Sequence, residues 1–368
     1  MKTLVLGGYG NFGARICRAL ADDPHIDLLV GGRDPAKARR MAEALGGRAQ
    51  GVAIDMNGED LSGALRGLGA ELVIHTAGPF QQQGYDVPLA VADAQAHYID
   101  LADGRRYVCD FAQSVGPAFQ RVQRTAISGA STVPALSSAV VDDLTRGWTH
   151  IESIDICIAP AQTAPRGEAT LAAVLSYCGA PIQVWQQGAW VTRHGWADPQ
   201  SVSFARLHPR LGALCDIPDL ELLPRHYPTV QSVTFRAALE LKVAQRALAL
   251  LAQLRRMGLL TQPSRLAKFM NTVGGLFDSL GSSLGGMVVR VRGQDADGRA
   301  VQRAWHIAAD HDHGPEIPCM AAIILARRIA RDEPMPQAAQ ACLSMLTLDD
   351  FAPEFARWGM VCDTVEEA

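Results

Sequence analysis

The amino-acid sequence predicts an α/β fold in which a doubly wound parallel sheet is joined to an inserted α+β domain. Short apolar segments alternate with segments of helical composition over the first 150 residues, which is typical of a parallel sheet covered by helices on both faces. A glycine-rich turn follows the first apolar segment, at a place where such sheets bind ligands. Beyond residue 150 strands and helices no longer alternate strictly, which indicates a domain of another class.

The chain begins with a strand, a turn and a helix. Residues 3–6 form a short apolar run that ends at Gly7, and apolar side chains then recur at helical spacing from Phe12 to Leu20. A second apolar run over residues 26–30 predicts the second strand. These segments form the first β-α-β unit of the predicted sheet.

The alternation continues after the second strand. Asp34 and Pro35 suit the N-cap and the first position of the next helix. Residues 87–96 have helical composition, and Pro134 is placed to open a further helix after the sixth strand. The remaining strands of the sheet are expected over residues 52–54, 72–74, 98–101 and 126–128.

The second half of the chain mixes strands and helices without strict alternation. A β-hairpin is expected from residues 287–291 to residues 301–307, with its turn at Gly298. Other strands are expected over residues 153–159 and 232–235, and helices over residues 169–177, 239–257 and 319–329. The last helix is expected to pack back on the first domain. The predicted domains are the doubly wound sheet over residues 1–148, an α+β domain for substrate binding and dimerisation over residues 149–313, and a group of C-terminal helices over residues 314–368.

Composition and charge exclude several classes of protein. The charged fraction is 20% and the hydrophobic fraction 48%, so the chain can form a core and is not intrinsically disordered. A net charge of −4 gives no overall field for nucleic acid or for an anionic membrane surface. The eight cysteines show neither a C-x-x-C pair nor metal-ligand spacing, so no metal is expected. With no apparent signal peptide and no membrane-length apolar run, we expect a cytoplasmic protein without membrane insertion.

The glycine-rich turn has the spacing of a dinucleotide-binding motif. Gly8, Gly10 and Gly13 form G-x-G-x-x-G between a predicted strand and a predicted helix, which is the Rossmann-type context that this motif requires. Glycine allows the tight turn, the approach of the backbone to a pyrophosphate, and close packing of helix on strand. The alternative is a turn that only packs. The residues expected to bind the cofactor here are Gly8, Tyr9, Gly10, Asn11, Phe12 and Gly13.

The end of the second strand indicates which nicotinamide cofactor is preferred. An NAD site usually has an acidic residue there to accept a hydrogen bond from the ribose, but this sequence has Arg33. A guanidinium can bind the 2′-phosphate of NADP with charge-assisted hydrogen bonds. NADP is therefore the expected cofactor and NAD the less favoured one. Alternatively, Arg33 is an ordinary solvated surface residue.

Two further motifs carry a resemblance to a known family. The sequence after the fourth strand reads His75-Thr76-Ala77-Gly78-Pro79-Phe80, and a Tyr98-Ile99-Asp100 element follows. With the glycine-rich turn and Arg33, this resembles the nucleotide-binding domain of the saccharopine dehydrogenase-like family. The resemblance implies that Thr76, Ala77, Gly78, Pro79 and Phe80 flank the nucleotide. Looser similarity extends through Arg166-Gly167-Glu168-Ala169-Thr170, residues 286–291 and residues 314–318.

Hydride transfer also needs a proton donor or positive potential beside the substrate. The candidates are Asp100, Asp103 and Arg105, which follow the fifth strand. Asp100 alternatively caps the loop that follows it. Second-domain candidates are Arg166, Glu168, His226, Tyr227, His311 and His313.

The sequence therefore predicts an NADP-dependent oxidoreductase that acts on an unidentified carbonyl, imine or alkene. We expect it to be a homodimer with a small-molecule substrate, with its active site between the two domains. No Tyr-x-x-x-Lys pair is present, which argues against a short-chain dehydrogenase. The alternative is a non-catalytic NADP-binding sensor or scaffold, because no clear acid or base signature stands out.

Overall fold

The contacts of the chain divide it into two units, which are described separately below. The structure is a computed structural model that describes residues 1–165, 167–275 and 277–367, without the side chains of residues 168, 169 and 273. Unit 1 comprises Met1–Ala135 and Glu316–Cys342, and unit 2 comprises Leu136–Pro315 and Leu343–Ala368. The segment for which the sequence suggests one group of helices, residues 314–368, is thus shared between the units. The expected domain boundaries at residues 148 and 313 stay predictions.

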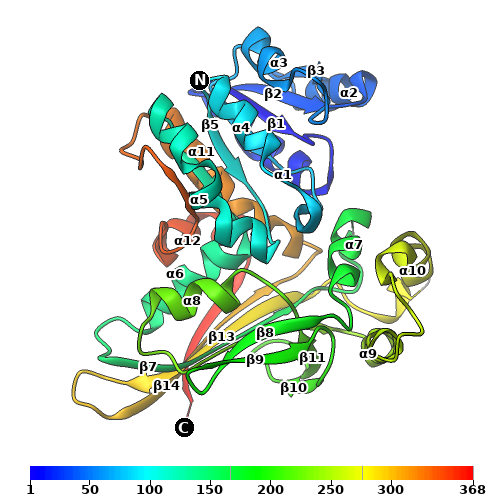
Figure 1. Ribbon diagram of the computed structural model, residues 1–368, viewed down its shortest axis with the longest axis vertical. Coiled ribbons are helices and arrows are strands. Elements are labelled where there is room, and N and C mark those ends of the chain that lie inside the picture. The colour runs from blue at the N-terminus through cyan, green and yellow to red at the C-terminus, as the bar shows by residue number, and fades with distance from the viewer. Residues whose placement is uncertain (166, 276, 368) are drawn as a thin grey trace. The chain divides into compact units, whose positions relative to one another are not determined.

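Unit 1 is built on a seven-stranded sheet in the order β15-β6-β5-β4-β1-β2-β3. Figure 1 labels β1, β2, β3 and β5 of this sheet. All its strand pairs are parallel. The order 3-2-1-4-5-6 is that of dinucleotide-binding sheets, and the direction in which successive strands are added to the sheet reverses between β1 and β4. The predicted doubly wound parallel sheet is therefore confirmed. Its strands are β1 (Lys2–Leu6), β2 (Asp27–Gly32), β3 (Gln50–Ala53), β4 (Leu72–His75), β5 (His97–Asp100), β6 (Ala126–Ser128) and β15 (Ala339–Ala341).

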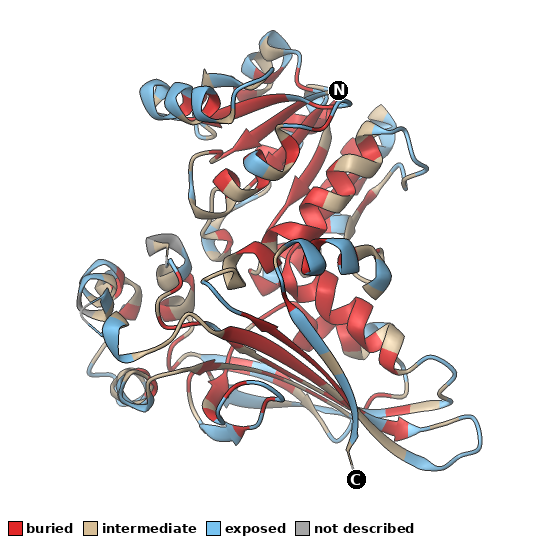
Figure 2. Cartoon of the chain, turned by 180° about the vertical axis from the view of Figure 1, so that it is seen from behind, coloured by how far each residue is buried: buried red, intermediate tan, exposed pale blue. Residues whose placement is uncertain are grey.

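Helices cover both faces of this sheet, which explains why its central strands are continuous apolar runs (Figure 2). All four residues of β4 are buried, for example. α1 contacts α2 and α11 in one layer, and α4 contacts α3 and α5 in the other. The helices are α1 (Asn11–Leu20), α2 (Pro35–Leu45), α3 (Leu61–Leu68), α4 (Asp86–Asp93), α5 (Arg105–Val122) and α11 (Ile317–Ala330), with the short η1 (Phe80–Gln82).

The cap of α2 lies where the sequence predicts it. The Asp34 carboxylate accepts hydrogen bonds from the backbone N–H groups of Ala36 and Lys37, at 2.9 and 3.1 Å. The helix expected to open at Pro134 differs from the prediction, because Val133 has an extended backbone, which a following proline favours. The chain passes through the π-helical turn η2 (Thr132–Leu136) before α6 (Ser137–Leu144) begins.

Unit 2 contains a large mixed sheet in the order β10-β11-β12-β7-β13-β14-β16, to which β8 and β9 are attached. β12 and β7 pair in parallel and the other pairs are antiparallel, so the predicted α+β class is confirmed. The predicted hairpin is present as β13 and β14. The strands are β7 (His150–Ala159), β8 (Pro181–Gln186), β9 (Ala189–His194), β10 (Gln200–Val202), β11 (Arg210–Leu214), β12 (Ser232–Leu239), β13 (Gly285–Gln294), β14 (Ala300–Ala309) and β16 (Val361–Glu367).

Several helices of unit 2 pack against this sheet, and Trp305 of β14 meets Phe355 at 6.1 Å between ring centres. The helix expected from residue 239 begins three residues later, because Leu239 still belongs to β12. Among the described residues, no helix is long and apolar enough to cross a bilayer. Beside α6, the helices are α7 (Glu168–Ser176), α8 (Asp219–His226), α9 (Lys242–Arg256), α10 (Ala267–Gly275) and α12 (Leu348–Arg357), with the short η3 (Pro263–Leu266), η4 (Asp278–Leu280) and η5 (Gly314–Glu316).

Candidate functional site: a dinucleotide cradle in unit 1

The glycine-rich turn is tightly folded between β1 and α1. Gly7 has φ +81°, and the N–H groups of Gly7 and Gly8 both donate to the carbonyl oxygen of Gly31, at 3.0 and 2.9 Å. The Gly10 N–H donates to the Gly7 oxygen at 2.8 Å. These bonds fix the turn and bring the first residues of α1 to the carboxyl end of β1.

Side chains would not fit in this turn. A Cβ atom at Gly13 would lie 2.1 Å from the Gly7 oxygen, and one at Gly8 would lie 2.9 Å from the side chain of Val30. Gly10 is the N-cap residue of α1, so no side chain caps this helix. The N–H groups of Asn11, Phe12 and Gly13 thus begin the helix with the geometry in which a helix N-terminus binds phosphate.

α1 is held in place by its own side chains and by α11. The Arg15 guanidinium donates to the carbonyl oxygen and the side-chain oxygen of Asn11, each at 2.7 Å. It also pairs with Glu316 at 3.0 Å, and both of these side chains are largely buried. The Cys319 thiol of α11 lies 3.6 Å from the Phe12 oxygen. A late segment of the chain therefore supports the helix that would bind the phosphates.

Tyr9 connects the glycine-rich turn to the end of β2. Its hydroxyl accepts a hydrogen bond from the Asp34 N–H at 3.0 Å, and a Cβ at Gly32 would lie 2.3 Å from the Tyr9 ring. The Arg33 side chain is exposed and forms no ion pair with any residue that the structure describes. The guanidinium is therefore available to an anionic ligand at the end of β2.

The loop after β4 lies directly against the glycine-rich turn. The Thr76 hydroxyl donates to the Leu6 oxygen at 2.8 Å, and a Cβ at Gly13 would lie 2.8 Å from that hydroxyl. Gln83 holds the loop by donating to the carbonyl oxygens of Ala77 and Pro79, at 2.8 and 3.2 Å. The Gly78–Pro79 peptide bond between them is cis.

Phe80, which the resemblance places beside the nucleotide, has a buried ring. This ring packs against His75 and Tyr107, at 5.0 and 5.4 Å between ring centres. His75 in turn shares a hydrogen bond of 3.0 Å with the Tyr98 hydroxyl, which lies 3.1 Å from the hydroxyl of Tyr107. Burial lowers the pKa of His75 to about 4, so the imidazole is neutral at pH 7.

Asp100 is buried in unit 1 and joins the carboxyl ends of β5 and β6 through hydrogen bonds. Its carboxylate has no exposed surface and accepts hydrogen bonds from the N–H groups of Ala102 and Gly129, at 2.9 and 2.8 Å. The Ser128 hydroxyl donates to the same oxygen at 3.0 Å. Burial raises the pKa of Asp100 to about 6, and these donors only partly offset that effect.

The other two candidates for catalysis differ in exposure. Asp103 is half-buried, accepts a hydrogen bond from the Gln81 amide at 3.0 Å, and has a pKa that burial raises above its ordinary value. Arg105 is the first residue of α5 and is 9% exposed. Asp100 is the last residue of β5 and Asp103 lies three residues beyond it, but only Asp103 reaches the surface.

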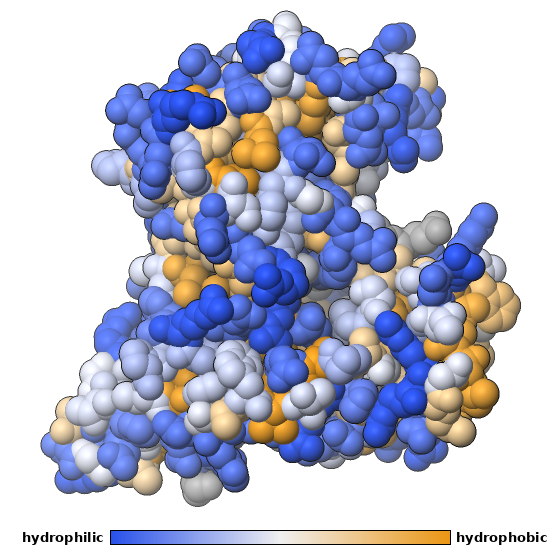
Figure 3. Space-filling view, viewed as in Figure 1, coloured by the Kyte–Doolittle hydropathy of each residue, from blue (hydrophilic) through white to orange (hydrophobic). Residues whose placement is uncertain are grey.

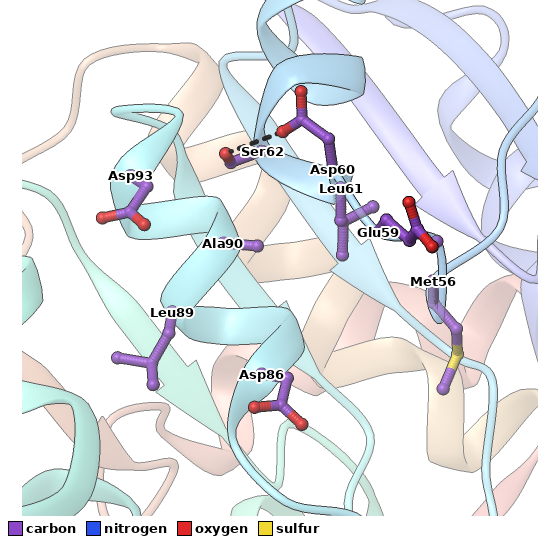
Figure 4. Close-up of a pocket in the computed structure, with 10 residues that line it drawn as sticks. Met56, Glu59, Asp60, Leu61, Ser62, Asp86, Leu89, Ala90 and Asp93 are labelled. Atoms are coloured by element: carbon purple, nitrogen blue, oxygen red, sulfur yellow. Dashed lines mark hydrogen bonds between the residues drawn. The ribbon is translucent and has the colours of Figure 1, made fainter.

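A separate hollow of about 250 Å³ lies between the N-terminus of α3 and α4 (Figure 4). Asp60 in its wall accepts hydrogen bonds from the Gly63 N–H at 2.7 Å and from the Ser62 hydroxyl at 3.3 Å. Because four carboxylates line this hollow, it does not suit a phosphate group. The lining residues are Met56, Gly58, Glu59, Asp60, Leu61, Ser62, Asp86, Leu89, Ala90 and Asp93.

The second-domain candidates have structural contacts within unit 2 where they are described. His226 lies 3.1 Å from the Ser344 hydroxyl, Tyr227 donates to Asp142 at 2.5 Å, and His313 lies 3.1 Å from the Trp358 oxygen. Arg166 and the side chain of Glu168 lie outside the described residues. Among the described candidates, those for cofactor binding lie together around the glycine-rich turn, whereas those of unit 2 contact other parts of their own unit.

Three residues of the site were not predicted from the sequence. Gln83 fixes the loop after β4, Gln81 binds Asp103, and Glu316 supports α1 from a distant part of the chain. Nothing in the local sequence distinguishes either glutamine from a surface residue. The Gly314-Pro315-Glu316 motif did carry the resemblance, but its contact with Arg15 depends on tertiary structure.

Comparisons with known proteins establish the fold. No protein-family model matches the chain, and no curated protein matches its sequence. The apo structure of saccharopine dehydrogenase (L-Glu forming) from Saccharomyces cerevisiae matches 100% of this chain and 100% of its own, with a TM-score of 0.69 and 13% identity.

Two other solved structures are less similar. An engineered D-amino acid dehydrogenase bound to NADP+ has a TM-score of 0.46 and 15% identity, covering 96% of this chain and 98% of its own. A meso-dapdh mutant with DAP from Clostridium tetani E88 has a TM-score of 0.45 and 11% identity, covering 96% and 99%. The expected resemblance is confirmed at the level of architecture: the chain has the fold of saccharopine dehydrogenase.

Proposed function

We propose that this chain is an NADP-dependent oxidoreductase that transfers hydride to or from a carbonyl, imine or alkene of a small molecule. The observation that carries the proposal is the glycine-rich turn, which leaves no room for side chains at Gly8 and Gly13 and lies where the strand order reverses. The fold that the chain shares with saccharopine dehydrogenase supports the oxidoreductase class. The homodimer and the cytoplasmic location stay predictions.

Different residues of unit 1 would bind different parts of the dinucleotide. The N–H groups at the start of α1 would bind the pyrophosphate, and the exposed Arg33 would bind the 2′-phosphate that distinguishes NADP from NAD. Thr76, Ala77, Gly78 and Pro79 would flank the nucleotide with backbone that Gln83 holds in place. When bound, the nicotinamide supplies or accepts the hydride.

Among the three candidates for catalysis, Asp103 is the residue that we propose as the proton donor. Its carboxyl is half-buried at the surface of unit 1, and burial raises its pKa above the ordinary value, which favours the protonated form that a proton donor needs. Arg105 would supply positive potential near the same strand end. Asp100 has only internal hydrogen bonds, so we assign it to positioning of the loops after β5 and β6.

The cofactor assignment is tested with the variant Arg33→Ala. A charged hydrogen bond contributes about 1.5–3 kcal/mol, so the dissociation constant for NADPH should rise about 10- to 150-fold, and that for NADH should change little. Nucleotide fluorescence titration measures both constants. Arg121→Ala is the matched control, because Arg121 is an exposed arginine in the last turn of α5, outside the proposed nucleotide site. Equal losses for NADPH and NADH would contradict the assignment of Arg33.

Catalysis is tested by following deuterium from labelled NADPH into the products of a panel of carbonyl, imine and alkene compounds. We expect label in at least one product, and we expect Asp103→Asn to slow that transfer without weakening NADPH binding. Tight NADPH binding with no transfer to any compound would instead favour the non-catalytic sensor or scaffold.

A further inference from the structure

α9 carries apolar side chains on two opposite sides. Its inner side, with Leu248 and Ala252 buried, packs on β11 and β12. Its outer side carries Val243 and Leu250, which are 64% and 60% exposed, and Met257 just beyond the helix is 62% exposed. The spacing of seven residues places these three side chains in one stripe along the helix.

The exposed apolar surface continues beyond α9. Leu259 follows the helix, Phe269 belongs to α10 and Leu280 ends η4, and each is at least 67% exposed. Of the eleven large apolar side chains that are exposed among the described residues, seven lie between residues 243 and 280. Figure 3 shows apolar side chains gathered over the part of the surface that α9 and α10 form. Clustering of this kind marks an interaction surface, whereas single exposed apolar residues are ordinary.

The same segment is strongly basic in a chain whose net charge is −4. Residues 242–280 contain six Lys or Arg residues and one acidic residue, Asp278. Arg255 is used internally, because its guanidinium donates to the carbonyl oxygens of Ser176 and Cys178, at 2.8 and 2.9 Å. The other five are exposed and form no ion pair with any described residue: Lys242, Arg246, Arg256, Arg265 and Lys268.

We propose that this α9–α10 surface, formed by the exposed residues between 242 and 280, binds the surface of an anionic phospholipid bilayer. Apolar side chains along one side of a helix can enter the boundary between headgroups and acyl chains, while neighbouring cations bind anionic lipids. The positive charge of this surface favours an anionic bilayer over a second copy of the chain as its binding partner. A two-fold contact between copies would bring the same unpaired cations of both copies together. Nucleic acid would leave the apolar stripe exposed to water.

This proposal does not depend on the proposed oxidoreductase function, and its test needs no nucleotide or substrate. The full chain is sedimented with vesicles of phosphatidylcholine alone and with vesicles containing about 30 mol% phosphatidylserine. We expect binding to the anionic vesicles only. Raising the salt from about 0.1 M to about 0.5 M should weaken that binding, because salt screens the attraction of the cations.

Two double variants separate the apolar and the charged contributions. Leu250→Ser with Met257→Ser, and Arg246→Gln with Lys268→Gln, should each weaken binding to anionic vesicles about tenfold or more. The matched controls are Leu89→Ser and Arg121→Gln in unit 1, which should bind as the parent chain does. Thermal melting checks that each variant is folded, which we expect because all four substituted residues are exposed.

Several results would overturn the proposal. These are absence of binding to either vesicle, equal binding to neutral and anionic vesicles, and unchanged binding by both double variants. The proposal would also be overturned if the chain does not bind vesicles but self-associates, and if Leu250→Ser with Met257→Ser abolishes that self-association. This outcome would show that the surface joins two copies of the chain.

Discussion

Gly13 shows how one missing side chain can define a site. Its Cα lies so close to the turn after β1 that an added methyl group would meet both the Gly7 oxygen and the Thr76 hydroxyl. The first of these is a backbone atom and cannot rotate away. The requirement for glycine therefore comes from packing of α1 against two loops, before any ligand is considered.

The variant Gly13→Ala tests this packing. We expect it to lower the free energy of unfolding by about 1–3 kcal/mol, the usual cost of overpacking, and to weaken NADPH binding because α1 must shift. Urea unfolding and nucleotide titration measure the two effects. Gly67→Ala in α3 is the control: a Cβ there meets nothing within 4 Å, so helix propensity should make that variant slightly more stable. A Gly13→Ala protein as stable as the parent would contradict the geometry.

Asp100 carries a pH dependence that follows from its burial. Its pKa is raised from 3.8 to about 6 in the folded chain. Below about pH 4 the carboxyl is protonated in both the folded and the unfolded state, and its contribution to the free energy of unfolding is at its maximum. Between about pH 4 and pH 6 the unfolded chain releases the proton first, so the free energy of unfolding should fall by up to about 3 kcal/mol.

The variant Asp100→Asn lacks this titration, so comparison with the parent isolates the contribution of Asp100 to the pH dependence of stability. The difference in unfolding free energy between the parent and the variant should fall across the window from about pH 4 to pH 6 and stay constant above it. Buried Asp219, whose pKa is raised to about 7, titrates in both proteins, and its contribution cancels in the difference. Urea unfolding at several pH values measures it. A difference that does not change with pH would show that Asp100 is not perturbed as its burial requires.

At the scale of the element, α2 illustrates which features the sequence predicts well. Asp34 and Pro35 act within one helical turn, so their pattern indicates the helix start without reference to the rest of the fold. The six strands β1 to β6 were predictable for a similar reason, because a short apolar run overlaps each of them. Strands β8, β9 and β10 were not, since they are short and partly exposed and lack a continuous apolar pattern.

The site divides in the same way. The glycines of the turn can be recognised from the sequence because the G-x-G-x-x-G spacing alone defines the motif. The structure gives a steric reason for that spacing. Phe80 could be placed only by resemblance, and its ring lies inside the aromatic cluster around Tyr107. The partners of Arg15 and Asp103 could not be predicted, because Glu316 and Gln81 reach them through tertiary packing.

The cap of α2 can be tested apart from cofactor binding. Asp34→Ala removes two hydrogen bonds to the first turn and should lower the melting temperature by about 2–4 °C. Asp34→Asn keeps an oxygen that can accept the same bonds, so it should melt close to the parent. Differential scanning calorimetry measures both. If Asp34→Asn melts as low as Asp34→Ala, the charge of Asp34 matters more than its role as a cap.

At the scale of the whole molecule, the chain crosses between the two units at residues 135, 315 and 342. Unit 1 nevertheless contains every residue that we propose for cofactor binding. Ligand effects on unit 1 and unit 2 should therefore be separable, because a ligand stabilises the parts of a protein that it orders.

Amide hydrogen exchange with and without NADPH tests this separation. We expect slower exchange in peptides covering residues 7–13, 31–34 and 76–83, where the nucleotide would contact backbone. Peptides from β13 and β14 should exchange at unchanged rates. The same experiment with NADH at equal concentration serves as the control. Protection spread evenly over both units would argue against a cradle confined to unit 1.

The late position of β15 affects how the chain emerges from the ribosome. β15 pairs with β6, and about 200 residues separate these neighbours in the sequence. At roughly 5–20 residues per second, translation leaves the outer edge of β6 without its partner for roughly 10–40 s. Unpaired strand edges invite association with other chains. A nascent chain of this protein should therefore need protection at β6, from a chaperone or from its own later segments, until residues 339–341 have been synthesised.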